Sequence, residues 1–231
     1  MQADTPPGQA SEAARYAVLR RIGPALKHDL VVELQALAMM SEVIGARLDR
    51  GMPPLADLQH HLSRLQRGTR EAVARALSVA TWLSPPEDDR INLREGILEC
   101  IALTRSALEF RGFRVRDDLP PTPIEVSHTS LRYLVLAAII RLTDEATTPG
   151  ELLVRSEVTP DLATLVLQMS PSAASDTTAA LPQEAPYRRI EAREVQALAA
   201  AARVGLGHEP GRMTMQLDRL VPTTPLKIAP L

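Results

Sequence analysis

The spacing of apolar residues in the first 83 positions constrains the fold of this chain more than any other feature. From Ser11 to about Arg50, apolar side chains recur every three or four residues, as they do along one buried face of an α-helix. A second run, from Leu55 to Leu83, comes close to a strict seven-residue repeat. Only the segment RGMPP, at 50–54, separates the two runs. A turn this short makes the two helices antiparallel neighbours, so the sequence predicts a long helical hairpin.

The expected buried faces of these helices can be read directly from the spacing. In the first helix they are Leu19, Ile22, Leu26, Leu30, Leu34, Leu37, Met40, Ile44 and Leu48. In the second they are Leu55, Leu58, Leu62, Leu65, Thr69, Ala72, Ala76, Val79 and Leu83. A lone hairpin of this length leaves apolar surface uncovered, so we expect two copies to close a four-helix bundle. Gly23-Pro24 is expected to kink the first helix or to restart it.

The pattern changes after the linker at 85–90. A short strand or turn followed by a helix is expected within 91–112, and further helices within 128–146 and 187–206. Strands are expected within 113–120, 121–127, 150–158, 162–170 and 211–220. The glycine-bearing segment VGLGHEPGR, at 204–212, is expected to be a turn, and the polar segment at 170–186 a loop. We therefore expect residues 1–10 to be disordered, residues 11–84 to form the hairpin, and residues 91–231 to form an α+β sandwich with helices on one face of a mixed sheet.

Composition excludes several classes of function. The net charge of −2 and a sequence pI of about 6.2 give no basic footprint for nucleic acid. The single cysteine, Cys100, rules out an intramolecular disulfide framework and favours a reducing compartment. No apolar run is long enough to span a membrane, and the N-terminus does not have the pattern of a secretory signal. These features predict a cytoplasmic protein that binds neither nucleic acid nor membrane.

An ionisable pair, His28-Asp29, lies in the middle of the first helical run. His28 is two residues from both Leu26 and Leu30, so it should point away from the apolar face. An imidazole has one unprotonated nitrogen near neutral pH and can act as a nucleophile. A neighbouring carboxylate can accept a hydrogen bond from the other ring nitrogen and so orient the ring. The alternative interpretation is that the pair is an ordinary solvated part of the helix surface.

The remaining ionisable and thiol side chains suggest no site of their own. His60 and His61 are adjacent in sequence and point to different sides of a helix, so they make a poor metal pair. His128 is expected near a helix start and His208 in a glycine turn, and both are interpreted as surface residues. Cys100 lies on an apolar helix face and is expected to pack in the core.

The order of elements resembles the transmitter core of bacterial sensor histidine kinases over roughly residues 15–221. LKHDLVVELQAL (26–37) is similar to the family's H-box, in which a histidine is followed by Asp or Glu. The stretch 91–120 is similar to the first helix and hairpin of the family's GHKL ATPase domain, and TSLRYLVLAAIIRLTDEA (129–146) to the helix that carries the N-box. The resemblance implies a dimerising hairpin that carries the phosphoaccepting histidine, followed by an ATPase-like α/β sandwich.

The sequence departs from the family at the positions that would bind ATP. The N-box asparagines that hold Mg²⁺ and the phosphates align with Ala137, which has no oxygen ligand, and with Arg141, which is a cation. The aspartate and glycines that should follow the strand LATLVLQM are missing, as is the later glycine-rich lid. The resemblance therefore implies a degenerate ATPase domain, with no bound nucleotide, cofactor or metal.

These features together predict a histidine phosphotransferase of a two-component phosphorelay. His28 would accept the phosphoryl group and Asp29 would orient it, while a response-regulator receiver domain supplies the reactive aspartate and its Mg²⁺. The exposed residues expected to contact the receiver are Arg21, Lys27, Val31, Val32, Gln35 and Met39. The first alternative is a non-catalytic pseudokinase that binds a kinase or a response regulator. The second is an active autokinase with an unusual ATP site.

Overall fold

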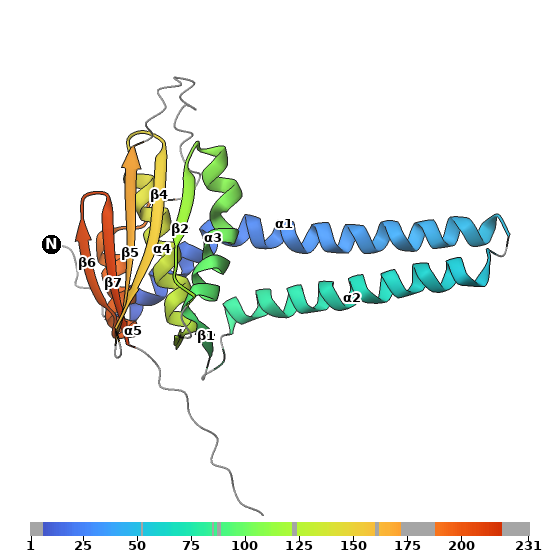
Figure 1. Cartoon of the computed structure of the whole chain (residues 1–231), viewed down its shortest axis with the longest axis horizontal. Coiled ribbons are helices and arrows are strands. Elements are labelled where there is room, and N and C mark those ends of the chain that lie inside the picture. Colours follow the sequence, from blue (N-terminus) through green and yellow to red (C-terminus); the bar gives the residue numbers. More distant parts are fainter. Residues whose placement is uncertain are drawn as a thin grey trace, which may run out of the picture. The chain divides into compact units, whose positions relative to one another are not determined.

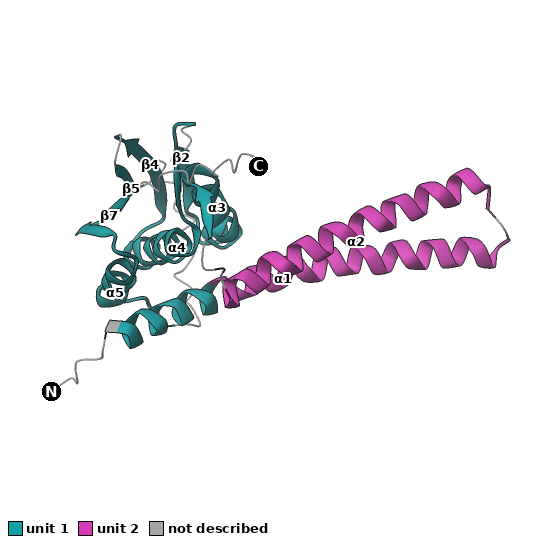
Figure 2. Cartoon of the chain, turned by 90° about the horizontal axis from the view of Figure 1, so that it is seen from below, with its two compact units in different colours: residues 1–21, 88–231 teal, residues 22–87 magenta. Residues whose placement is uncertain are grey.

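The computed structural model of the chain describes residues 7–51, 53–84, 86, 89–121, 124–159, 162–171 and 188–218. It divides into two compact units, one made of residues 1–21 and 88–231 and the other of residues 22–87 (Figure 2). The first unit is an α/β layer and the second is a helical hairpin (Figure 1). Disorder is expected over residues 1–10, but the chain is helical from Pro7 onward. Residues 1–6 and residues 172–186 of the expected loop lie outside the described part.

The hairpin consists of helix α1 (Pro7–Asp49) and helix α2 (Leu55–Leu83), as the apolar spacing predicts. The helices approach closely at Gly68, where an added Cβ would lie 2.9 Å from Cδ2 of Leu37. The expected restart at Gly23-Pro24 is wrong, because α1 runs unbroken through Pro24. The expected kink stays a prediction. A proline inside a helix removes one backbone hydrogen bond, and here the neighbouring turns continue without it.

The buried face of α2 differs from the expected seam. Leu58, Leu65 and Val79 are half-buried and Ala72 is buried, in agreement with the prediction. Leu55, Leu62 and Leu83 are exposed, and on α1 so are Leu34 and Leu48. The apolar residues of each helix thus cover more of its circumference than the helical partner can bury.

The α/β unit contains a five-stranded mixed sheet in the order β2-β4-β5-β7-β6 and a separate two-stranded sheet of β1 and β3. The strands are β1 (Arg90–Asn92), β2 (Arg114–Asp118), β3 (Glu125–Ser127), β4 (Gly150–Val158), β5 (Leu162–Pro171), β6 (Gly205–Glu209) and β7 (Arg212–Asp218). The helices are α3 (Leu93–Phe110), α4 (His128–Glu145) and α5 (Ala192–Ala202). Strand β2 runs parallel to β4, and the other pairs are antiparallel. The expected α+β fold, a hairpin followed by a mixed-sheet domain, is confirmed.

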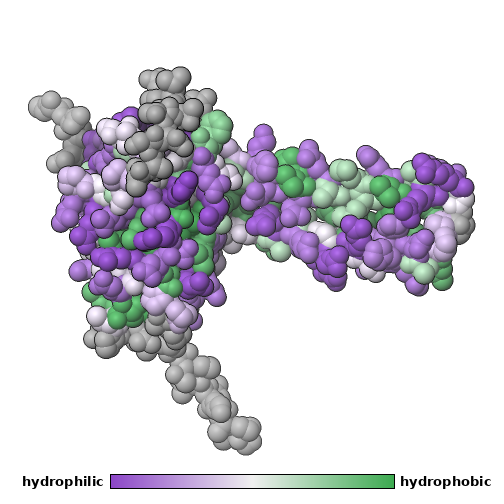
Figure 3. Space-filling view, turned by 45° about the horizontal axis from the view of Figure 1, so that its top comes forward, coloured by the Kyte–Doolittle hydropathy of each residue, from purple (hydrophilic) through white to green (hydrophobic). Residues whose placement is uncertain are grey.

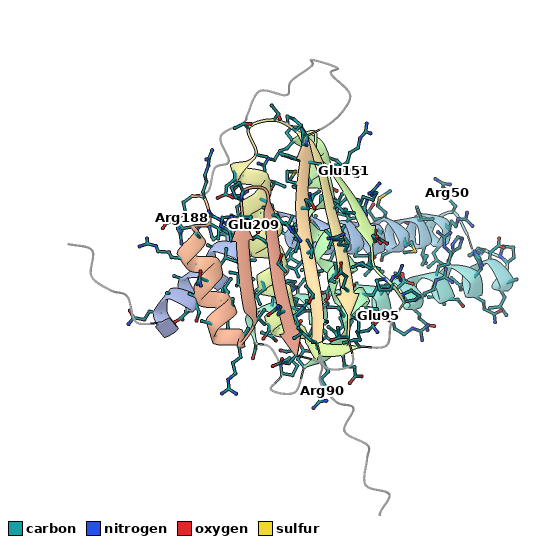
Figure 4. All side chains as sticks on the ribbon, turned by 60° about the vertical axis from the view of Figure 1, so that its left-hand side comes forward. Arg50, Arg90, Glu95, Glu151, Arg188 and Glu209 are labelled. Carbon is teal, nitrogen blue, oxygen red and sulfur yellow. The ribbon has the colours of Figure 1, made fainter. Side chains whose placement is uncertain are left out.

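Helix α4 forms the centre of the core. Twelve of its residues, from Leu131 to Thr143, are buried, because it packs between neighbouring helices and the sheet. The inward-facing residues of the central strands, such as Leu152 and Leu165, are also fully buried. Charged side chains such as Arg188, Glu151 and Glu209 lie at the periphery of the unit (Figure 4).

The segment VGLGHEPGR is not simply a turn. Residues 205–209 form strand β6, which pairs with β7 along its whole length, with Leu206 opposite Met215. The turn itself is confined to Pro210 and Gly211, and Gly211 has a φ of 70°, which favours glycine. Glycines at 205 and 207 obscured the strand, because glycine is depleted in strands and common in turns. Helix α5 is correspondingly shorter than expected and ends at Ala202.

The first turns of α1 belong to the α/β unit and not to the hairpin unit. Ala14 and Val18 are fully buried, and Ala17 is nearly so. The predicted hairpin domain of residues 11–84 therefore needs correction, since the unit boundary in α1 falls after Arg21. Sequence periodicity located the helix but not the surface on which each part of it packs.

Gly150 allows a close approach between two strands. A Cβ at this position would lie 2.2 Å from the carbonyl oxygen of Ser170, which belongs to the backbone of β5 and cannot rotate away. We expect Gly150→Ala to lower the free energy of unfolding by about 1–3 kcal/mol, measured by urea denaturation. Gly207→Ala is the matched control, because its Cβ would meet Thr214 at an ordinary 3.7 Å. Equal effects of the two substitutions would contradict the expectation.

Candidate functional site

The predicted catalytic pair lies on the exposed surface of α1. The side chain of His28 is 75% exposed and that of Asp29 is 45% exposed. Their closest atoms, Nδ1 of His28 and Oδ1 of Asp29, are 3.6 Å apart, which is longer than a hydrogen bond. In this conformation Asp29 is an electrostatic neighbour of the ring, on the Nδ1 side. Most of the imidazole is accessible to a partner.

Four of the predicted partner residues, Val31, Val32, Gln35 and Met39, follow His28 on α1. Val32, Gln35 and Met39 follow His28 at intervals of four, seven and eleven residues, which is the spacing of one helix face. All three are exposed, as are Val31 and the preceding Lys27. This face of α1 therefore presents a histidine followed by a mostly apolar strip.

Arg21 is not the exposed contact residue that the sequence predicted. Its side chain is only 10% exposed, and its guanidinium donates two hydrogen bonds, of 2.8 and 2.9 Å, to the carboxylate of Asp144 on α4. Helical spacing placed Arg21 correctly on the His28 side of α1. The spacing did not reveal that this part of α1 packs on the α/β unit, where Asp144 takes up the charge.

A groove of about 350 Å³ lies between the two helices of the hairpin. Its lining is mostly apolar and comes from both helices, namely Ala36, Met39, Met40, Val43, Ile44, His61 and Arg64. Met39 joins the groove to the strip that begins at His28. The sequence interpretation treated His61 as plain surface and did not consider Arg64. Only the antiparallel pairing of the two helices could have indicated that His61 and Arg64 lie opposite Met39, where the strip on α1 ends.

A second apolar surface lies on the other side of the hairpin. Leu34 follows Val32 by two residues, a rotation of about 200° around α1, so the two side chains point to nearly opposite sides. On α2, Leu62 precedes Arg64 by the same interval. Leu55, Leu62, Val73 and Leu77 are all exposed and share one face of α2. Hydrophobic residues are visible among hydrophilic ones along the hairpin surface in Figure 3.

The two positions expected to replace the N-box asparagines hold a buried alanine and a paired arginine. Ala137 is fully buried. The guanidinium of Arg141 donates a 2.9 Å hydrogen bond to the carbonyl oxygen of Ile190 and forms an ion pair with Glu145. Glu145 also lies 3.6 Å from Nε2 of His208, a residue of β6. Neither Ala137 nor Arg141 offers the side-chain oxygen that an asparagine would present to Mg²⁺.

His128 belongs to a polar cluster that the sequence interpretation missed. Its Nδ1 lies 3.1 Å from Oδ1 of Asp89, and its Nε2 lies 2.7 Å from Oε2 of Glu99. Arg132 donates a 2.9 Å hydrogen bond to the other oxygen of Glu99. The cluster joins the segment before β1 to α3 and α4. Local sequence patterns could not reveal this cluster, because its members lie up to about forty residues apart in the sequence.

The environment of Glu99 makes the α/β unit sensitive to acid. Burial by itself raises the pKa of Glu99, but the hydrogen bond from His128 and the charge of Arg132 outweigh it, and the pKa lies below its usual value of 4.5. Ionised Glu99 therefore stabilises the folded state above about pH 4.5, and this contribution is lost as the pH falls through the lower folded-state pKa.

We expect Glu99→Gln to destabilise the chain at pH 7 and to have a shrinking effect below pH 4.5. Urea denaturation of both proteins between pH 7 and pH 3 measures the difference in unfolding free energy. Glu109→Gln is the control, because Glu109 is an exposed residue of the same helix and lies 4.0 Å from Arg105. A Glu99→Gln effect that stays constant over this range would show that ionisation of Glu99 does not contribute to stability.

Cys100 packs in the core as expected, and burial raises the pKa of its thiol. Within the described ranges, no group of three or more histidine, cysteine, aspartate or glutamate side chains has the geometry of a metal site. No helix of that same part combines the length and apolar content needed to cross a membrane.

No family model and no curated protein matches this chain. Among solved structures, it is similar to the mycobacterial sensor histidine kinase MprB, with 15% identity and a TM-score of 0.42 over 57% of this chain and 97% of that chain. It is similar to the Acinetobacter baumannii histidine kinase AdeS, with 14% identity and a TM-score of 0.40 over 83% and 96%. It is also similar to a bacterial phosphotransferase, with 14% identity and a TM-score of 0.36 over 87% and 95%. Values of this size establish neither a family nor an activity.

Proposed function

We propose that this chain is a histidine phosphotransferase that relays phosphoryl groups between receiver-domain aspartates through a phosphohistidine at His28. The observation that carries the proposal is the exposed His28-Asp29 pair in the H-box-like segment of a helical hairpin. That hairpin is joined to an α/β unit whose N-box positions, Ala137 and Arg141, offer no side-chain oxygen for Mg²⁺. We infer that this phosphoacceptor is loaded from a receiver and not from ATP.

The transfer step requires only His28 and a phosphorylated partner. The lone pair of Nε2 forms a bond to phosphorus as the bond between phosphorus and the aspartyl oxygen breaks, and the aspartate leaves as a carboxylate. Asp29, on the Nδ1 side, stabilises the positive charge that the ring acquires. The receiver supplies the Mg²⁺ that neutralises charge on the phosphoryl oxygens. Transfer to a second receiver is the reverse of the same step.

The receiver docks on the face of α1 that carries His28. Lys27, Val31, Val32, Gln35 and Met39 are its contacts on α1, and the groove between α1 and α2 extends them. Of the seven residues that line this groove, Arg64 is the only one with a fixed charge, so a partner surface with apolar side chains and a nearby carboxylate fits best.

A second copy of the chain covers the opposite face. The exposed leucines Leu34, Leu55 and Leu62 lie on the side of the hairpin away from Met39 and Arg64. Self-association through this face closes a four-helix bundle and leaves His28 and the groove free. Dimerisation and docking of the receiver therefore do not compete for the same surface.

We expect Leu62→Glu to weaken self-association by at least about tenfold, since it places a charge in the centre of the apolar face. Analytical ultracentrifugation over a range of protein concentrations measures the dimer dissociation constant. Arg67→Glu is the matched control on a different side of α2. Equal dissociation constants for Leu62→Glu and wild type would place the dimer interface elsewhere.

Phosphoryl transfer from a labelled receiver tests the proposal directly. Receiver domains from the same cell are phosphorylated, freed of the kinase and of ATP, and mixed with the chain. A parallel mixture contains the chain and labelled Mg-ATP alone. We expect acid-labile label on the chain from a receiver and none from ATP. Label from ATP would instead support the autokinase alternative.

The groove on the hairpin also supports the second candidate, a non-catalytic protein that binds a kinase or a response regulator. Binding in the groove requires no chemistry at His28. Measuring both receiver binding and transfer of label on the same samples therefore distinguishes the two functions. Tight receiver binding without any transfer of label would favour the binding function over the phosphotransferase.

A further inference from the structure

One stripe of α4 faces away from the sheet and is covered by protein. Tyr133, Ala137, Ile140 and Asp144 follow one another at intervals of four, three and four residues, so their side chains point to the same side of the helix. Ala137 is fully buried, and Tyr133 and Ile140 are nearly so. The side chain of Asp144 is only 5% exposed, although it carries a charge. A stripe that ends in a buried carboxylate needs a cationic partner.

The partner is the first part of α1, which lies beside α4 and α5 (Figure 2). At one end of the stripe, the guanidinium of Arg21 pairs with both oxygens of Asp144 at 2.8 and 2.9 Å. At the other end, the guanidinium carbon of Arg15 lies 5.6 Å from the centre of the Tyr133 ring. Ala14 and Val18 are fully buried in the same segment. Ala137 and Ile140 lie between the two points of contact.

The carboxylate of Asp144 is built to hold an arginine. Arg111 approaches its Oδ1 at 3.1 Å and donates a 2.9 Å hydrogen bond to the carbonyl oxygen of Thr143, so it comes from the α/β unit itself. Arg21 completes the pair from α1 with a two-bond geometry that lysine cannot reproduce.

We propose that the α4 stripe is a helix-binding site selective for arginine, and that residues 7–21 are its built-in ligand, which binds and releases as a unit independently of the sheet. The position that the family resemblance assigns to an N-box asparagine, Ala137, then faces the chain's own helix. This inference does not depend on whether His28 accepts a phosphoryl group, because none of its contacts involves the hairpin unit.

Hydrogen exchange of backbone amides in the full chain, measured by mass spectrometry, tests the site with substitutions in α1 and in α4. Arg21→Ala removes the contact to Asp144 from the ligand. Arg20→Ala is its matched control, since Arg20 is an exposed neighbour whose guanidinium contacts Tyr16 on the same helix, at 3.3 Å from the hydroxyl oxygen. We expect Arg21→Ala to speed exchange of amides 11–21 at least about tenfold, with strands β4 and β5 unchanged, and Arg20→Ala to leave both regions as in wild type.

A volume change tests the stripe itself. Ala137→Leu adds bulk toward α1, whereas Ala138→Leu adds the same bulk about 100° further round α4. We expect the first to speed exchange of amides 11–21 selectively and the second to speed exchange in the sheet. The proposal is overturned if amides 11–21 exchange rapidly in wild type, or if Arg21→Ala changes nothing. It is equally overturned if the variants speed exchange uniformly over the unit.

Discussion

Replacing His28 by glutamine is expected to abolish acceptance of a phosphoryl group from a receiver, lowering the rate by at least roughly 1,000-fold. Glutamine fills similar space, but its amide nitrogen has no free lone pair with which to attack phosphorus. His28 is 75% exposed, so the change should alter the free energy of unfolding by less than about 0.5 kcal/mol. Loss of transfer therefore cannot be attributed to loss of fold.

The measurement is the initial rate of labelling from a phosphorylated receiver, with wild type and His28→Gln side by side. Thermal unfolding of both proteins provides the check on folding. His60→Gln is the matched control, because it changes another exposed histidine of the hairpin, one that does not line the groove. Transfer to His28→Gln at the wild-type rate would exclude His28 as the acceptor and leave it an ordinary residue of the helix surface.

Replacing Leu165 by alanine is expected to lower the free energy of unfolding of the α/β unit by about 2–5 kcal/mol. Leu165 is fully buried on β5, the central strand of the five, between Ser156 of β4 and Met215 of β7. The substitution removes contacts on all sides and leaves a cavity that a hydrogen-bonded sheet cannot close. For a domain of ordinary stability this is a large share of the total.

Urea denaturation followed by circular dichroism measures this effect. Leu165→Met keeps the volume and the apolar character, and should cost less than about 1.5 kcal/mol. If alanine and methionine had the same effect, the core around β5 would tolerate a cavity, and the packing described here would be wrong at that position.

Local sequence patterns were sufficient for the secondary structure. The three-and-four spacing of apolar residues predicted α1, α2, α3 and α4, because a helix buries one face whatever it packs against. Alternation and short apolar runs predicted β2, β4, β5 and β7. The exception was β6, where Gly205 and Gly207 lack the side chains that show a strand in a sequence.

The candidate site was only partly accessible from the sequence. The exposure of His28 and of the strip from Val32 to Met39 followed from their positions on one helix. The contribution of His61 and Arg64 depends on the register between two helices, which intrahelical spacing does not determine. The cluster of His128 with Asp89 and Glu99 combines three segments that are distant in sequence.

The sequence by itself thus determined the elements of this protein and the chemistry of its exposed His28-Asp29 pair, because both depend on residues within a few turns of one another. The tertiary structure alone decided what becomes of Arg21 and of the first turns of α1. By its spacing, Arg21 belongs to the face of His28, yet a buried carboxylate more than a hundred positions away, Asp144, binds it. A charge that must be neutralised in the interior overrides local periodicity, and no local pattern records where its partner will come from.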